Sequence, residues 1–133
     1  MLLIKNHINM STHKLFWLSF FSGGIFLIYY LAKYQDYFNN FFKKEVISDT
    51  CLYFAIIFLG ANFYAHMQNN GVKSSVNIGF FIFSILLLVM SYRLAKEFEK
   101  YSNKKLNPIM IFFFHIFYLN YFINNSENFK PLK

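Results

Sequence analysis

Four long stretches of this chain contain no lysine, arginine, aspartate or glutamate, and they cover residues 15–32, 51–67, 76–92 and 106–123. A bilayer core about 30 Å thick is crossed by about 20 helical residues. None of the runs alternates apolar and polar residues, as the strands of a membrane barrel do. With short extensions, the runs predict an all-α membrane protein with four transmembrane helices, at approximately 15–32, 48–67, 76–95 and 106–123.

The composition indicates the same class of protein. Hydrophobic residues make up 56% of the chain, aromatic residues 23% and charged residues only 14%, whereas an ordinary soluble domain carries about 25% charged residues. One small water-soluble core could not hide so many large side chains. A soluble helical protein would also need broad charged helix faces, which these runs lack. We therefore expect a single membrane domain, 1–133, in the inner (plasma) membrane of a bacterium.

The positive charges flank the apolar runs. There are 13 Lys and Arg against 6 Asp and Glu, a net charge of +7, and we expect these cations to contact anionic lipid headgroups rather than nucleic acid. The loops after the first and third runs hold eight cations, and the tails and remaining loop hold five. This bias favours those two loops in the cytoplasm and both termini outside. The cations of the two loops are Lys33, Lys43, Lys44, Arg93, Lys96, Lys100, Lys104 and Lys105. Those of the tails and the remaining loop are Lys5, Lys14, Lys73, Lys130 and Lys133.

The loop at 33–50 allows two interpretations. Its aromatic residues recur at helical spacing, which predicts an amphipathic helix lying in the headgroup region. Alternatively, the first helix simply continues to the last of these residues. They are Tyr34, Tyr37, Phe38, Phe41 and Phe42.

The other connections carry shorter signals. Asn69-Asn70-Gly71 predicts a tight turn between the second and third helices. A charged segment at 93–100 predicts that the third helix continues beyond the membrane, with ion pairs three residues apart at Lys96–Glu99 and Glu97–Lys100. Asn107-Pro108 predicts the start of the fourth helix, with Asn as N-cap and Pro in the first turn.

Polar and small side chains inside the runs are the candidate functional residues. The polar ones either join helices by hydrogen bonds worth about 0.6–2 kcal/mol each or line a narrow aqueous path in an oligomer. The small ones let neighbouring helices approach closely. The polar candidates are Asn62, His66, His115 and Asn120, and the small candidates are Gly24, Gly60, Ala61, Ala65 and Gly79.

The two histidines also raise the hypotheses of a haem ligand pair and a proton relay. His66 lies in the last turn of its predicted span and His115 near the middle of its own, so their depths differ by about 10 Å. Axial haem ligands need similar depths, so we expect His115 to bond a neighbouring helix and His66 to lie at the interface. Cys51 is the single cysteine, which excludes an intrachain disulfide and a multi-cysteine metal site.

Catalytic patterns are missing from the sequence. There is no GxSxG, no HExxH, no glycine-rich phosphate loop and no pair of carboxylates inside the runs. We therefore expect a protein that is not an enzyme, with no cofactor, no metal and no small-molecule substrate.

The end of the first run carries a pattern of spaced residues. Ser22-x-Gly24-Ile25-Phe26-x-x-Tyr29-Tyr30-x-x-Lys33 resembles a motif in small bacterial inner-membrane proteins of unknown function, where Tyr stands at the position of Phe26 and Trp at that of Tyr30. That resemblance implies a membrane topology and no particular chemistry. In length and in Phe, Tyr, Lys and Asn content the chain is also similar to immunity proteins against pore-forming bacteriocins.

These observations favour a small non-enzymatic integral membrane protein that works by helix–helix association. It would be a subunit of a membrane partner, an immunity protein or a small homo-oligomer, in contact with membrane lipid. One alternative is a pore or channel, such as a membrane-permeabilising defence or lysis effector. Another is a redox or proton-handling membrane subunit that uses His66 and His115.

Overall fold

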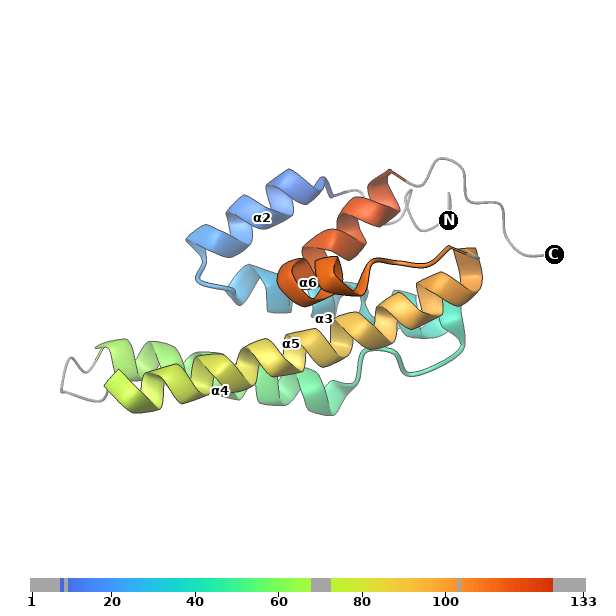
Figure 1. Cartoon of the computed structure of the whole chain (residues 1–133). Coiled ribbons are helices and arrows are strands. Elements are labelled where there is room, and N and C mark those ends of the chain that lie inside the picture. The colour runs from blue at the N-terminus through green and yellow to red at the C-terminus, as the bar shows by residue number, and fades with distance from the viewer. Residues whose placement is uncertain (1–7, 9, 68–72, 103, 126–133) are drawn as a thin grey trace.

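The computed structural model describes residues 8, 10–67, 73–102 and 104–125, and in these ranges it contains five helices and no strand. The all-α class predicted from the sequence is therefore confirmed. The helices are α2 (Thr12–Phe21), α3 (Ile25–Phe42), α4 (Asp49–Met67), α5 (Lys73–Ser102) and α6 (Pro108–Asn124) (Figure 1).

The prediction of four membrane-spanning helices is not supported. Among the described residues, one helical stretch is long and apolar enough to cross a membrane, Ile78–Ser102 of α5. The apolar parts of α4 and α6, Asp49–Tyr64 and Pro108–Asn124, are shorter. The first predicted span, 15–32, is not one helix at all. The apolar runs do fold as helices, but the hydrophobicity of a run does not show whether it forms one continuous helix.

A two-glycine break divides the first run. The helix α2 ends at Phe21, and Gly23 and Gly24 have φ angles of 59° and 93°, a left-handed region that glycine adopts without steric cost. The Gly24 N–H donates to the Ser19 carbonyl at 2.8 Å, which closes the C-terminal turn of α2. Because the chain turns here, the first run forms two helices, α2 and α3, and not one continuous helix.

A second irregularity lies in α6. Asn107 caps this helix, its side chain accepting from the backbone N–H groups of Ile109 and Met110, and Pro108 occupies the first turn, as predicted. Further along, His115 has φ 44° and ψ −126°, and the helix bends there. Positive φ is uncommon for a residue with a side chain and costs of order 1–3 kcal/mol.

The helix α3 runs without a break to Phe42, which is the second of the two interpretations of 33–50. Lys43, in the left-handed conformation, ends it. The aromatic side of this segment packs on protein, since Phe38 is fully buried and contacts the Phe98 ring of α5 with 5.9 Å between centroids. The predicted turn at 69–71 lies outside the described residues.

The helices form a closed ring of neighbours. Each one packs on the next in chain order from α2 to α6, and α6 returns to pack on α2. The antiparallel α4–α5 hairpin is the longest part of the molecule, and α2 and α6 lie on the same side of it in Figure 1. The core between the helices is made of leucine, isoleucine and aromatic side chains, with Tyr30, Phe38 and Phe98 among the largest fully buried ones.

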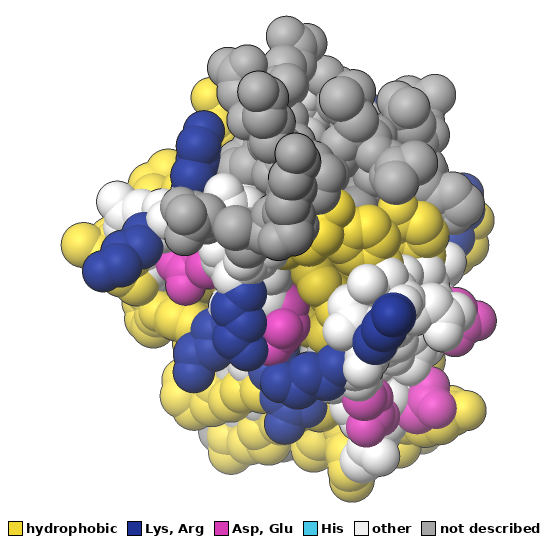
Figure 2. Space-filling model, turned by 90° about the vertical axis from the view of Figure 1, so that its right-hand side faces the viewer, with side chains coloured by type: hydrophobic (Ala, Val, Ile, Leu, Met, Phe, Trp, Pro, Cys, Tyr) yellow, Lys and Arg dark blue, Asp and Glu magenta, His cyan; other side chains and the backbone are white. Residues whose placement is uncertain are grey.

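Charged residues gather at one end of the molecule. This charged end, formed by residues 43–49 and the part of α5 from Arg93 onward, faces the viewer in Figure 2. Glu97 joins its two parts, because its carboxylate accepts from both Lys44 and Lys100 at 3.0 Å. The ion pair between Glu97 and Lys100 is one of the two predicted for this segment. Large apolar side chains, by contrast, are exposed on every helix.

Candidate functional site

The two helix irregularities lie at one cavity, called here the break cavity. It has a volume of about 450 Å³ and is open at the molecular surface. The end of α2, the glycine break, α5 and the bend of α6 all contribute to its walls. Its lining residues are Phe16, Ser19, Phe20, Gly23, Gly24, Leu27, Phe80, Phe83, Ser84, Leu87, His115 and Phe117.

Two of the lining residues each carry a buried polar atom that lacks a hydrogen-bond partner. The two atoms are Ser19 Oγ and His115 Nδ1, and both are shielded from solvent. Ser19 as a whole is only 5% exposed. Ser84 lines the same cavity, but its hydroxyl donates to the Phe80 carbonyl one turn earlier at 2.9 Å. A buried polar group without a partner costs about 1–3 kcal/mol, so native structures rarely keep one without a reason.

The glycine break is fitted tightly against the other helices. A Cβ atom on Gly23 would lie 2.8 Å from Cζ of Phe63 in α4, closer than real contacts allow. One on Gly24 would lie 3.4 Å from Phe83 in α5. The structure therefore places the predicted packing residue Gly24 in the wall of the break cavity, together with His115.

Asn120 lies farther along α6, outside the break cavity, and is fully buried. Its Oδ1 accepts from the Tyr30 hydroxyl at 2.8 Å, and its Nδ2 donates to the Met10 carbonyl at 3.1 Å and to Thr12 Oγ1 at 3.2 Å. Asn124, one turn later, donates to the same two oxygens at 3.0 and 3.3 Å. These bonds tie the end of α6 to α3 and to the start of α2.

The remaining candidates lie on the α4–α5 hairpin. Gly79 is in close packing, since a Cβ there would lie 3.4 Å from the Phe58 carbonyl oxygen. Gly60 has no atom within 4 Å of such a Cβ, and Ala61 beside it is exposed. Asn62 is half-buried and its Oδ1 has no partner. The side chains of His66 and Ala65, in the last turns of α4, are outside the described part of the structure.

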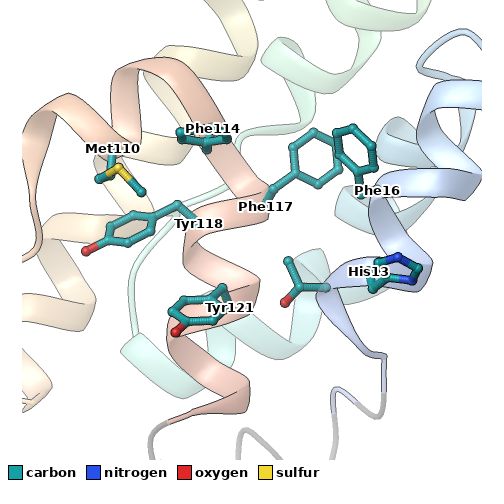
Figure 3. A pocket seen from close by; sticks show the side chains of 8 residues that line it. His13, Phe16, Met110, Phe114, Phe117, Tyr118 and Tyr121 are labelled. Atoms are coloured by element: carbon teal, nitrogen blue, oxygen red, sulfur yellow. The ribbon is translucent and has the colours of Figure 1, made fainter.

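A second hollow, the aromatic groove, lies between α2 and α6 (Figure 3). Its volume is about 400 Å³ and its surface is almost wholly apolar. The rings of Phe16 and Phe117 meet edge to face, 5.6 Å between centroids, and separate it from the break cavity, which they also line. At its edge, His13 Nε2 accepts from the Trp17 indole N–H at 2.9 Å.

The electrostatics of the charged end centre on Glu97. Glu97 lies in the charged C-terminal part of the stretch Ile78–Ser102, after the uncharged residues 78–92. The hydrogen bond from Lys100, and behind it the one from Lys44, holds the pKa of the Glu97 carboxyl below its usual range, although partial burial opposes this. A cleft of about 350 Å³ beside it is lined by Lys44, Glu45, Val46, Arg93, Lys96 and Glu97.

Sequence reasoning missed the break cavity and its serines. The sequence predicted Gly24 as a packing residue, although the adjacent Gly23 and Gly24 also indicate a turn. The bend at His115 has no comparable signal. Among the described residues, no group of three or more His, Cys, Asp or Glu is placed to share a metal ion.

Comparison with known proteins adds no relative. No family model, no curated protein and no solved structure matches this chain. The resemblances noted for the first run and for the composition therefore stay predictions, and the functional argument rests on the fold and the sites alone.

Proposed function

We propose that this chain is a small, non-enzymatic integral membrane protein that acts by helix–helix association with a second copy or another membrane protein. The observation that carries the proposal is the outward face of α4. Its residues recur at i, i+4, i+7, i+8 and i+11, the spacing of one helical stripe. All of them are exposed, and they are Tyr53, Ile57, Gly60, Ala61 and Tyr64.

The distribution of charge and apolar surface supports lipid as the surroundings. Phe81 of α5 is 66% exposed, Ile57 of α4 is 59% exposed and Phe113 of α6 is 68% exposed. Exposed apolar patches of this extent are rare on soluble monomers and mark contact with lipid or with a partner. The charged end would lie at the headgroups, where lysines are attracted to anionic lipid.

Small residues on the outward face of α4 would allow another helix to pack closely against it. Association in lipid depends on close packing, and glycine or alanine at the contact lets two backbones approach. Gly60 and Ala61 are open to the outside, whereas Gly79 packs within the protein. The flanking aromatic residues would close around an incoming helix.

The test uses Gly60→Leu, which adds bulk to the open stripe. Full-length protein labelled with donor or acceptor dyes is mixed in lipid vesicles, and energy transfer is read as the protein is diluted with lipid. We expect concentration-dependent transfer, or a defined partner in a pull-down from native membranes, and a loss of about tenfold in either for the variant. Phe113→Leu on α6 is the matched control. Absence of both signals, or full association by Gly60→Leu, contradicts the proposal.

A pore is the second candidate, because Asn62 carries an unpartnered polar atom on α4. In an oligomer this half-buried side chain would have to turn outward to line a lumen, because its Oδ1 is buried in the single chain, whereas Asn120 is held inside the protein by its hydrogen bonds. Liposome flux separates the two functions. Leakage of ions that falls in Asn62→Leu supports the pore, and tight vesicles at every pH from about 5 to 8, where histidines titrate, refute it.

A further inference from the structure

We infer that the break cavity binds a neutral, lipid-soluble small molecule with an apolar ring or chain and a single hydroxyl group. This is a ligand-binding function beyond helix association, and it does not depend on whether the α4 face has a partner. The cavity's volume of about 450 Å³ lies within the range of about 300–1,000 Å³ of small-molecule sites.

The walls select an apolar and neutral occupant. The rings of Phe16, Phe20, Phe83 and Phe117 and the side chain of Leu27 form most of the lining, and no Lys, Arg, Asp or Glu is among the lining residues. A charged headgroup would lose its hydration here without gaining a counter-charge, which is far more costly than burying a neutral group. Aromatic walls suit a ring or a short chain.

The polar groups select a hydroxyl. Ser19 Oγ and His115 Nδ1 are buried, have no partner and belong to residues that line the cavity from α2 and α6. A hydroxyl both donates and accepts, so it can receive the Ser19 proton and donate to the histidine nitrogen, or the reverse in the other tautomer. A hydrocarbon of the same shape would leave both groups unsatisfied.

Ser84 provides a comparison for Ser19. It lines the same cavity, but its hydroxyl already donates its proton to the Phe80 carbonyl, so unlike Ser19 Oγ it has a partner. The cavity therefore holds one serine that needs a partner and one that does not, which provides a matched pair of Ser→Ala variants.

The experiment is photolabelling of the full chain in lipid vesicles with a diazirine derivative of benzyl alcohol, followed by peptide mapping. We expect label at buried cavity residues such as Leu27 and Phe83. The competitors are 4-propylphenol and propylbenzene, compared at equal concentration in the membrane. The phenol should displace the label about tenfold more effectively.

The variants complete the test. Ser19→Ala should reduce the phenol's advantage about tenfold, whereas Ser84→Ala should leave it unchanged. His115→Ala should act like Ser19→Ala, with circular dichroism confirming its helix content. Equal displacement by the hydrocarbon, equal behaviour of the two serine variants, or label spread over outward residues such as Ile57 and Phe113 overturns the inference.

Discussion

Replacing Gly23 with alanine tests whether the first apolar run is broken as described. At φ 59°, a residue with a Cβ atom costs about 1–2 kcal/mol. The new methyl group would lie 2.8 Å from the Phe63 ring, and such overpacking costs about 1–3 kcal/mol. Alanine also lowers the entropy of the unfolded chain, which returns about 0.4–1 kcal/mol. The net loss of unfolding free energy is therefore about 1–5 kcal/mol.

The control is Gly60→Ala in the middle of α4. No atom lies within 4 Å of the added Cβ, and alanine is the better helix former by about 0.5–1 kcal/mol. Both variants are unfolded in mixed micelles, and circular dichroism follows the loss of helix as the fraction of denaturing detergent rises. Gly23→Ala should unfold at a lower detergent fraction than the parent protein, and Gly60→Ala at a higher one. If Gly23→Ala matches the parent protein or gains stability, residues 15–32 form a continuous helix and the fold described here is wrong.

Three further perturbations address the polar contacts. Asn120→Leu leaves the Tyr30 hydroxyl without its acceptor and should cost about 1–3 kcal/mol; in a double-mutant cycle with Tyr30→Phe, measured by the same unfolding assay, a coupling near zero would contradict the hydrogen bond. Asn39 accepts from two loop amides and donates to the Ile47 carbonyl, so Asn39→Ala should speed hydrogen exchange at Ile47 several-fold, and unchanged exchange would refute that role. Because Lys100 and Lys44 depress the pKa of Glu97, its contribution to stability is complete above the ordinary glutamate pKa and is lost as pH falls through the lower folded value. Glu97→Gln should flatten the stability profile below about pH 5, and a profile identical to that of the parent would contradict the assignment.

The lengths of the uncharged apolar runs correctly predicted the positions of three helices. Predicted spans 48–67, 76–95 and 106–123 correspond to α4, α5 and α6, because long uncharged runs between turn and cap signals fold as helices in any apolar setting. The N-cap at Asn107 could also be predicted from the sequence. An asparagine side chain can accept hydrogen bonds from the free N–H groups of the first helical turn, and a following proline is typical of that turn.

The sequence did not predict where helices are interrupted or which distant residues form hydrogen bonds with each other. The conformations at Gly23 and His115 depend on what packs around them, and neither changes the hydrophobicity of its run. Tyr30 lies 90 positions before Asn120, and their hydrogen bond exists only because α6 closes the ring of helices. Asn39 lies in the segment for which the sequence allows a headgroup-region helix, yet its side-chain amide accepts from two backbone N–H groups of the loop that follows α3. Local pattern reports a residue's type of surroundings, and tertiary packing decides which neighbour it meets.

Membrane residence is the claim on which the proposed function depends, and an alkaline carbonate wash of cell membranes tests it most directly. Carbonate strips proteins held only by charge, whereas the proposed crossing of the bilayer by α5 and the proposed lipid contacts of the exposed Ile57 and Phe113 would hold this chain in the membrane. We predict that the full-length protein stays in the washed membrane pellet and is released by a mild non-ionic detergent. Recovery of the folded protein in the detergent-free supernatant would contradict the account.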